Sequence, residues 1–509
     1  MTMSVEESDL SSLLSSATLV FFGSVLGSVS KLVERIFIAR VLTTDAYGEV
    51  SLGIAVMSIS VTVGLVGLDQ GIARYVSRFE DDRDVRGVWI TGLVIAITLA
   101  LLLTAALVVF LDETHQLLFD QARSRGLLLV FVAAIPFVVG LKVTVGAIRG
   151  LENTIYRTYS YDIIYRGMRI LLVVGLLYAG YGIVAAGYAY LAAAIGALIA
   201  AHYLLNRLFP LFGPFRTHTR EMLTFSAPLV LSTLLTLLLT KADTVMLGFF
   251  RSSHQVALYS AAYPLANGLP VILASFGFLY LPLASRLDVD DKTQEINEIY
   301  KVTTKWIFIV TFPLFVTFVA FPSDMLTLVF GEEYAQASLA LIILSSGFFV
   351  QAAYGRSLDT LSALGYTNYI LLANVFAFTL NIVLNLLLIP MYGFLGAAIA
   401  SAASYTLLNV VQYVVLRGLF GISPFSKWVQ RTFLVLPLTV LPAAIAASTV
   451  VSLTYVTLPL VPAVIGIVSV GLVSVTGCLQ PEDKLPLELI EDALGITLPF
   501  IWRFVPSER

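Results

Sequence analysis

The stretch IARVLTTDAYGEVSLGIAVMSISVTVGLVGLDQGIARYVSRF, residues 38–79, decides the fold class of this 509-residue chain. Its centre, residues 47–68, is apolar and long enough to cross a bilayer, because a spanning helix needs about 20 mostly apolar residues. Arg74 and Arg78 follow it, as basic residues follow the spans of many membrane proteins. The stretch therefore predicts a transmembrane helix and the loop after it.

The same pattern recurs along the whole chain. Hydrophobic residues make up 58% of the sequence and charged residues 12%, whereas roughly a quarter of the residues in soluble proteins are charged. We therefore expect an all-α, polytopic membrane protein with about 14 spans and no large soluble domain. The predicted spans are 14–38, 47–68, 87–111, 127–148, 161–179, 182–206, 222–249, 256–282, 304–322, 337–361, 366–389, 393–416, 432–452 and 456–478.

The basic residues predict the orientation, because Lys and Arg concentrate in cytoplasmic loops. If the N-terminus is inside, 22 of the 30 basic residues fall in inner segments, four in outer segments and four within spans. The sequence thus predicts a multi-pass protein of the plasma membrane with both termini in the cytoplasm. The acidic N-terminus has no basic region or cleavage motif, so we expect the first span to be retained.

A weak internal repeat divides the chain. At a shift of 209 residues the first span aligns with the seventh, and Glu34 falls on Asp243. Two further matches follow at nearly the same shift: SRFEDD (77–82) with SRLDVD (285–290), and GYGIVAAG (180–187) with MYGFLGAA (391–398). The repeat predicts two pseudo-symmetric six-helix lobes of parallel orientation.

The domain boundaries follow from the repeat and from a break near Gly213 and Pro214. The predicted parts are an N-lobe (1–210), an elbow (211–221), a C-lobe (222–420), two extra spans (421–479) and a cytoplasmic or interfacial tail (480–509).

Polar side chains interrupt the first and seventh spans. Lys31, Glu34 and Arg35 lie in the first span, and Lys241 and Asp243 lie in the seventh. Ionisable residues at membrane depth are costly and normally face a partner or a wet cavity, so we expect the two helices to face each other across a central space. A polar stripe at helical spacing accompanies them: Ser24, Ser28, Thr233, Thr236, Thr240 and Thr244.

Among the charged residues expected to face the central space, cations outnumber carboxylates by four to two. Glu34 and Asp243 are the two carboxylates, and we interpret them as candidates for ion coupling. A net positive cavity suits an anionic cargo, phosphate above all, since Lys and Arg supply charge-assisted donors. Two alternatives stay open: long basic side chains snorkel toward the membrane surface, or Glu34 pairs with a basic neighbour, Lys31 or Arg35. The predicted cavity cations are Lys31, Arg35, Lys142 and Lys241.

Other polar residues carry weaker hypotheses. Asp243 and Asn381 could supply oxygen ligands to sodium, although asparagines in spans more often bond one helix to another. Near the start of the fifth span, Asp162, Arg166 and Arg169 indicate either an inner cavity mouth or a solvated face. No metal or nucleotide motif is present, so we expect no cofactor beyond a coupling Na⁺ or H⁺. Scattered basic residues argue against nucleic-acid binding.

The opening stretch also resembles a known family. Arg40, Tyr47 and Gly48, and then Gly67-Leu68 and Arg74, fill the pattern of the polysaccharide-biosynthesis flippases, the O-antigen (Wzx-like) type of the multidrug/oligosaccharidyl-lipid/polysaccharide exporter superfamily. The resemblance implies a V-shaped two-lobe fold. It also implies that the protein moves a polyprenyl- or dolichyl-(pyro)phosphate-linked oligosaccharide between leaflets by alternating access.

The fourteen spans are similar in number to those of lipid II flippases, whose last two spans help to hold the lipid tail. That likeness implies contact with membrane lipids and function as a monomer. A cation-coupled multidrug exporter of the same superfamily is the alternative, but such a protein favours buried carboxylates. A membrane glycosyltransferase or polymerase is disfavoured because the outer loops are short. We therefore expect a transporter for cell-surface polysaccharide or protein glycosylation, and no enzyme.

Overall fold

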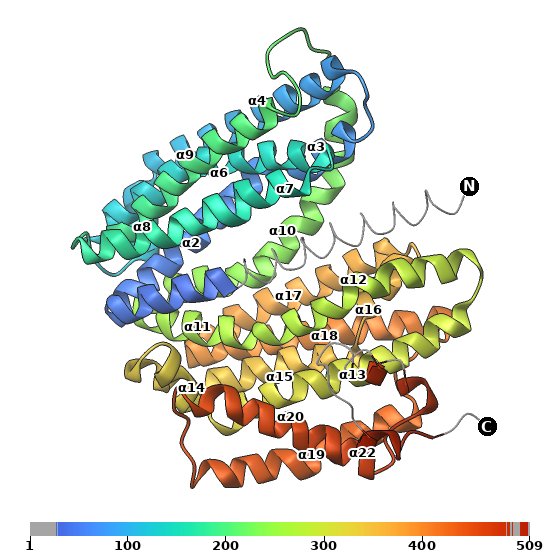
Figure 1. The fold of residues 1–509 in the computed structure, drawn as a ribbon. Coiled ribbons are helices and arrows are strands. Elements are labelled where there is room, and N and C mark those ends of the chain that lie inside the picture. The colour runs from blue at the N-terminus through green and yellow to red at the C-terminus, as the bar shows by residue number, and fades with distance from the viewer. Residues whose placement is uncertain (1–26, 28, 485, 489–490, 492–498, 507–509) are drawn as a thin grey trace. The chain divides into compact units, whose positions relative to one another are not determined.

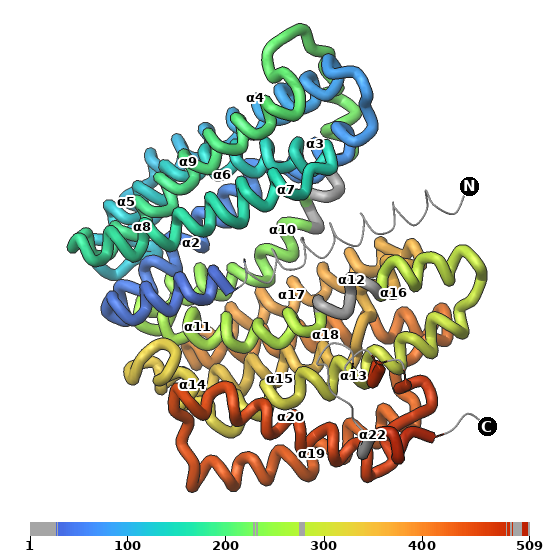
Figure 2. Tube along the Cα trace, in the orientation of Figure 1, coloured from blue at the N-terminus to red at the C-terminus, as the bar shows by residue number. Residues whose placement is uncertain are grey.

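The structure is a computed structural model that describes residues 27, 29–484, 486–488, 491 and 499–506; at 227–229, 231–232, 274–279 and 499–500 it describes the backbone alone. The described part contains helices and no strand, and Figure 1 shows their arrangement. Figure 2 traces the same path and marks the residues left aside. The all-α prediction is therefore confirmed.

The chain packs as two compact units. Unit 1 comprises the residues up to Ser260 together with Ile389–Phe394, and unit 2 comprises Ala261–Leu388 and Leu395–Arg509. Unit 1 starts with a helix described over 29–41, here called the first helix. Its other elements are α2 (Thr44–Leu65), α3 (Leu68–Val76), α4 (Asp82–Val109), α5 (Leu111–Leu118), α6 (Ser124–Gly150), α7 (Thr154–Arg157), η1 (Thr158–Tyr165), α8 (Arg166–Tyr178), α9 (Val184–Asn206), α10 (Thr219–Phe250) and the start of α11 (Ser253–Ala266).

Unit 2 continues from within α11. Its elements are α12 (Gly268–Val289), α13 (Thr293–Ala320), α14 (Pro322–Val329), η2 (Glu332–Ala337), α15 (Ser338–Tyr354), α16 (Ser357–Ala363), most of α17 (Thr367–Tyr392), α18 (Phe394–Phe420), α19 (Lys427–Ser448), α20 (Thr457–Val475), η3 (Pro481–Asp483) and α22 (Pro499–Trp502).

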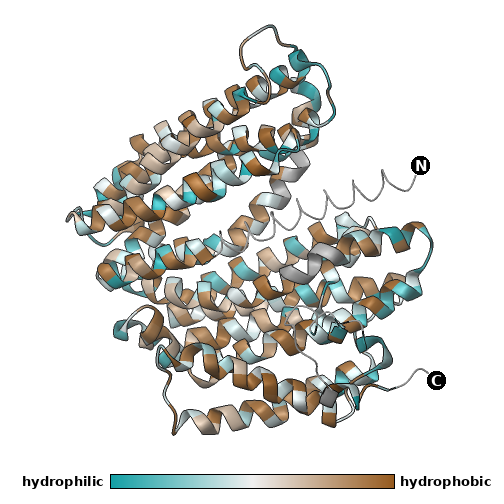
Figure 3. Cartoon of the chain, viewed as in Figure 1, coloured by the Kyte–Doolittle hydropathy of each residue, from teal (hydrophilic) through white to brown (hydrophobic). Residues whose placement is uncertain are grey.

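Twelve helices of the described residues are long and apolar enough to cross a membrane. Figure 3 shows apolar residues along the helices and polar residues gathered toward their ends and loops. These twelve correspond to twelve of the fourteen predicted spans. The predicted first span lies partly outside the described residues. The predicted fifth span is divided between η1 and α8, because a π-helical segment forms its start.

The order of the elements follows the predicted repeat. Helix starts recur at shifts of 209 to 211 residues: Thr44 and Ser253, Asp82 and Thr293, Leu111 and Pro322, and Val184 and Phe394. Within unit 1, α10 packs against α2 and α3, whereas the predicted boundaries assign its residues to the C-lobe. The segment predicted as an elbow is held to α4, because the Arg86 guanidinium donates to the carbonyls of Pro210 and Pro214.

The start of α2 is held against α11 by two of its residues, Tyr47 and Gly48. The Tyr47 hydroxyl donates to the Ser260 carbonyl at 3.1 Å. Gly48 lies so close to Ser253 that an added Cβ would stand 1.9 Å from its carbonyl oxygen. A glycine is therefore required here by the close approach of two backbones.

Gly48→Ala should destabilise the protein, because backbone on the facing segment cannot move aside as a flexible side chain would. We expect a loss of about 1–3 kcal/mol, the usual range for overpacking, seen as a lower apparent melting temperature in detergent. Gly175→Ala is the matched control: no atom lies within 4 Å of its added Cβ, and the helix gains propensity. Equal stability of the two variants would contradict this packing.

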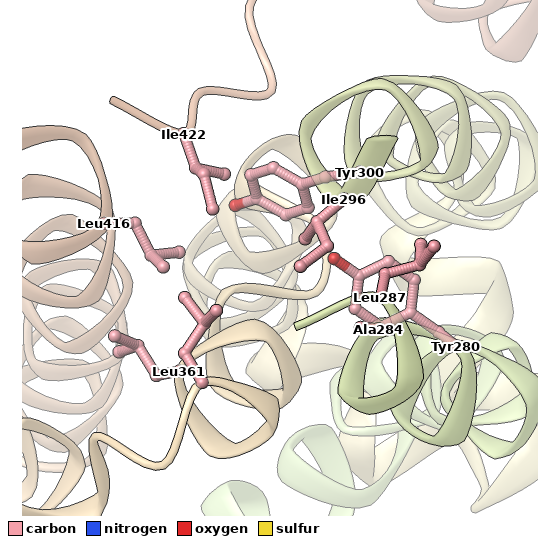
Figure 4. Packing of buried hydrophobic residues seen from close by; sticks show 9 residues of the cluster. Tyr280, Ala284, Leu287, Ile296, Tyr300, Leu361, Leu416 and Ile422 are labelled. Atoms are coloured by element: carbon pink, nitrogen blue, oxygen red, sulfur yellow. The ribbon is translucent and has the colours of Figure 1, made fainter. Parts of the chain in front are cut away.

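A buried cluster closes one end of unit 2. It joins the end of α12, the start of α13, α16 and the end of α18 (Figure 4). Two tyrosine hydroxyls are satisfied inside it: Tyr280 bonds to Thr360 at 2.7 Å, and Tyr300 donates to the Tyr354 carbonyl at 2.5 Å. These bonds fix the short helix α16 against its neighbours.

The short helix η3 is held to α13 by a buried ion pair. Lys305 and Asp483 form it, and both side chains are fully buried. The Trp306 indole N–H donates to Asp483 Oδ1 at 2.8 Å, and the Gln480 amide donates to Oδ2 at 2.7 Å. The carboxylate therefore has a partner for each oxygen, as a buried charge requires.

Candidate functional site

A polar cavity of about 350 Å³ lies wholly within unit 1. It is enclosed by the first helix, α2, α6, η1, α8, α9 and α10. Its lining consists of Lys31, Glu34, Arg35, Ile38, Ile54, Met57, Ser58, Val61, Thr62, Val138, Lys142, Tyr161, Tyr165, Arg169, Tyr190, Leu237, Thr240 and Lys241. The structure thus brings together all four predicted cavity cations, from the first helix, α6 and α10.

These four cations form no salt bridge within the described part of the chain. Among the described residues, no carboxylate oxygen lies within 4.0 Å of the charged nitrogens of Lys31, Arg35, Lys142 or Lys241. Isolated charges at membrane depth are retained where they face water or a partner of opposite charge. The cavity therefore offers charge-assisted donors that the protein itself leaves available.

Glu34 is the carboxylate in the lining, and its partner is Arg169. Arg169 Nε and Nη2 both donate to Glu34 Oε2, at 2.9 and 2.5 Å, and Glu34 is only 2% exposed. The pairing expected from sequence neighbours, with Lys31 or Arg35, is therefore wrong, because packing places α8 against the first helix. Glu34 Oε1 is buried without a hydrogen-bond partner in the described structure.

Three tyrosines line the wall beside this pair. The Arg169 guanidinium lies 4.3 Å from the Tyr190 ring centroid and 5.3 Å from that of Tyr165, within cation–π range. Tyr161 and Tyr165 belong to the π-helix η1, and such turns occur often at functional sites. Arg169 is thus held by a carboxylate and two aromatic faces, which leaves its charge balanced.

The neighbouring Asp162 is buried rather than solvated. It pairs with Arg157 at 3.2 Å and with Arg166 at 2.9 Å, and its side chain is 1% exposed. A Cβ on Gly27 would collide with the Arg166 guanidinium, so the glycine leaves room for that cation. Of the two hypotheses for this segment, the solvated face is therefore wrong, and Arg169 belongs to the cavity lining.

Glu34→Gln should lower the stability of the protein. The variant keeps the size of the side chain but leaves the buried Arg169 charge unpaired, which we expect to cost about 1–3 kcal/mol. The double variant Glu34→Gln/Arg169→Gln removes both charges and should recover part of that loss. Thermal unfolding of the wild type, Glu34→Gln, Arg169→Gln and the double variant measures it, and a double variant that loses the sum of the two single losses would contradict the pair.

The other predicted site residues lie elsewhere. Asp243 is buried and accepts a hydrogen bond from the Tyr259 hydroxyl at 2.5 Å. Asn381 is in unit 2 and accepts a bond from Asn385 at 3.0 Å. Thr233 accepts from Gln70 at 3.3 Å, and Thr240 is the stripe residue that lines the cavity. Thr236 and Thr244 lie on α10 outside the lining, and Ser24 and Ser28 fall outside the described residues.

The arrangement suits an anion better than a metal ion. The described residues contain no group of three or more His, Cys, Asp or Glu that could hold a metal. Four cations without an ion pair in the described structure, beside a balanced Arg169–Glu34 pair, instead create a positive site. Sequence reasoning named Arg169 only as part of a possible cavity mouth and overlooked Tyr161, Tyr165 and Tyr190 as lining residues; the polar residues near the start of the fifth span were the available signal.

Comparison with known proteins agrees with this fold. The sequence profile of the family described as "Polysaccharide biosynthesis protein" matches residues 13–288, more than half of the chain. The chain belongs to this family. A second profile, described as MatE, matches residues 228–387. The family assignment confirms the resemblance seen in the opening stretch of the sequence.

Two relatives of this protein come from Haloferax volcanii. One, "Probable flippase AglR", is 26% identical over 276 residues, which cover 54% of this chain and 57% of AglR. The other, "Probable low-salt glycan biosynthesis flippase Agl15", is 27% identical over 172 residues, 33% of this chain and 36% of Agl15. The chain spans about half or less of the length of these curated relatives.

The fold of this protein is similar to that of a protein of known structure. The lipid II flippase MurJ, in its inward closed conformation, matches with a TM-score of 0.71 at 14% identity. The match covers 90% of this chain and 97% of MurJ. This likeness confirms the predicted fold class, an all-helical membrane transporter fold built from two lobes.

Proposed function

We propose that this multi-pass membrane protein is a flippase for a lipid-linked oligosaccharide. Its cargo would carry a phosphate or diphosphate between a polyprenyl or dolichyl tail and the glycan, and would move from the cytoplasmic to the outer leaflet by alternating access. No covalent bond changes in this process, so the protein is a transporter rather than an enzyme. The product would serve cell-surface polysaccharide synthesis or protein glycosylation.

The observation that carries the proposal is the set of four unpaired cations in the unit 1 cavity. A phosphate group accepts several hydrogen bonds and compensates such charges, and Lys and Arg supply charge-assisted donors to it. The tyrosines of the same lining carry hydroxyl groups that can serve as further donors. The family description and the names of AglR and Agl15 support a glycan-linked cargo.

The distribution of basic residues supports the proposed topology. With both termini in the cytoplasm, cytoplasmic segments hold 22 of the 30 Lys and Arg residues. We propose that the protein works as a monomer in the plasma membrane, because the cavity is complete within unit 1 of a single chain. Coupling to Na⁺ or H⁺ through Glu34 or Asp243, with Asn381 as a further sodium ligand, belongs to the same proposal.

Depletion of the protein from its native cells tests the function directly. We expect one lipid-linked saccharide to accumulate, and to stay in the cytoplasmic leaflet, where added glycosidases or lectins cannot reach it in intact cells. Normal levels of that lipid and of surface glycan after depletion would contradict the proposal.

A cation-coupled multidrug exporter is the second candidate, because the MatE profile matches part of the chain. Such an exporter needs a cavity that attracts organic cations, whereas four unpaired positive charges repel them. Expression of this protein in a dye-sensitive host should therefore leave dye accumulation unchanged. Efflux of a cationic dye would favour the exporter.

A further inference from the structure

A second polar pocket lies in unit 2, at the end of α15. Its volume is about 230 Å³, and Pro270 and Leu273 of α12 form part of its apolar wall. Five polar residues contributed by α15, α16, α18 and the α15–α16 turn complete the lining: Gln351, Arg356, Asp359, Asn409 and Gln412. Because the unit 1 cavity shares none of these residues, the pocket is a separate site.

The turn that carries Arg356 is held in place by its neighbours. Gly355 ends α15 at φ +64°, a conformation that glycine adopts without strain. On the next helix, Ser357 bonds to the Tyr300 hydroxyl at 2.8 Å, and Thr360 bonds to Tyr280 at 2.7 Å. The pocket wall is therefore fixed by the same buried cluster that closes this end of unit 2.

The charges of the pocket are balanced. Arg356 pairs with Asp359 one turn along α16, and its Nη1 donates to the Leu273 carbonyl at 2.8 Å. The pocket therefore has no excess of positive charge, unlike the unit 1 cavity. A neutral ligand suits it better than an anion.

The pocket also contains hydrogen-bonding groups that the protein leaves unused. Arg356 is 8% exposed, and its Nε is buried without a partner in the described structure. Gln412 is 4% exposed, and neither its amide nor that of Gln351 has a hydrogen-bond partner among the described residues. A buried donor without a partner, such as Arg356 Nε, is costly, and the two amides line the same pocket, so these groups indicate a ligand that satisfies them.

Mixed donors and acceptors at close range match the hydroxyl groups of a sugar, since each hydroxyl both donates and accepts. The volume lies below the range of roughly 300–1,000 Å³ typical of drug-sized ligands, which leaves room for a single small ring. We propose that this pocket binds one neutral sugar residue of the lipid-linked saccharide. The proposal rests on the flippase function and adds a saccharide site that is independent of the cationic cavity.

Binding of two lipids by the purified full-length protein tests the pocket. The probes are dolichyl phosphate, used as its methyl ester, and dolichyl phosphate glucose; both are phosphodiesters with one negative charge, and they differ in the glucose. The wild-type protein should bind the glucose-bearing lipid more tightly. Gln412→Leu should weaken that binding about tenfold, as expected for the loss of one or two hydrogen bonds, and should leave binding of dolichyl phosphate unchanged. Thr406→Val, on the same helix but outside the pocket, is the control.

Three results would overturn the saccharide pocket: a wild-type protein that does not distinguish the two lipids, a Gln412→Leu variant with unchanged affinity for both, or one that loses both equally. Arg35→Ala tests the flippase proposal separately, because it should weaken both lipids. If Arg35→Ala binds both lipids as the wild type does, the cationic cavity is refuted, whatever Gln412→Leu shows.

A labelling measurement covers the case in which Gln412→Leu fails to fold. Cys478 is the single cysteine of the chain, so Gln412→Cys combined with Cys478→Ala carries one thiol, within the pocket. Dolichyl phosphate glucose should slow the reaction of this thiol with a maleimide several-fold, and dolichyl phosphate should not. Equal labelling rates with the two lipids would also contradict the proposal.

Discussion

Replacing Arg35 or Lys241 with alanine should lower the rate of cargo translocation by about ten- to hundredfold. Each cation would supply a charge-assisted hydrogen bond to the phosphate, and such bonds contribute about 1.5–3 kcal/mol. Neither side chain has an ion pair among the described residues, so its removal leaves no carboxylate without a partner. The measurement is the amount of surface glycan, and the rate of its recovery, in cells that depend on the variant.

Charge-retaining variants separate electrostatics from folding. Arg35→Lys and Lys241→Arg should keep a substantial part of the activity, because the positive charge stays in the cavity. Lys292→Ala, which removes an exposed cation just before the start of α13, should behave as the wild type. If Arg35→Ala and Lys241→Ala both support normal surface glycan, the cavity charges do not act on the cargo.

Replacing Asp483 with alanine should destabilise unit 2 by about 3–5 kcal/mol. The substitution leaves the fully buried Lys305 charge without its carboxylate, and breaking one side of a buried ion pair costs about this much. It also removes the acceptor for the Trp306 indole N–H. Thermal unfolding in detergent should show an apparent melting temperature several degrees lower, and labelling of Cys478 should speed up because the segment beside it loosens.

An exposed ion pair on the same helix provides the matched control. Glu295 pairs with Lys292 at 3.3 Å, but both side chains are about half exposed. Glu295→Gln should therefore change stability by no more than about 1 kcal/mol. If Asp483→Ala and Glu295→Gln have the same melting temperature, the buried pair does not hold η3 against α13.

The helical fold could be predicted because long apolar stretches of sequence indicate membrane-spanning helices. The fifth span is the instructive exception. Asp162, Arg166 and Arg169 lower the apolarity of its start, and the π-helix η1 divides the run into short elements. Local hydropathy locates such a segment in the sequence, but it does not indicate that the polar residues of the segment are buried inside unit 1.

The cavity cations could also be predicted, since Lys31, Arg35, Lys142 and Lys241 are conspicuous inside apolar runs. The cost of placing a charge in a membrane was enough to predict that these four residues line the same cavity, as they do. Local spacing did not predict the partner of Glu34, because Arg169 lies 135 residues away.

Two other arrangements depend on contacts that the sequence pattern does not contain. Lys305 and Asp483 are 178 residues apart, and each alone resembles a loop charge at the end of a span. Arg356 likewise resembles an ordinary cytoplasmic cation until α12, α16 and α18 enclose it. Helix packing, rather than local sequence, decides which polar residues become buried partners.

Reconstitution into proteoliposomes tests the central claim most directly. The wild-type protein and an Arg35→Ala/Lys241→Ala variant, inserted at equal density, would be compared for movement of a fluorescent dolichyl-phosphate-linked sugar between leaflets. We predict that the wild type speeds this movement and that the double variant does so at most a hundredth as fast. Equal rates for the two proteins, or no acceleration by the wild type, would contradict the account.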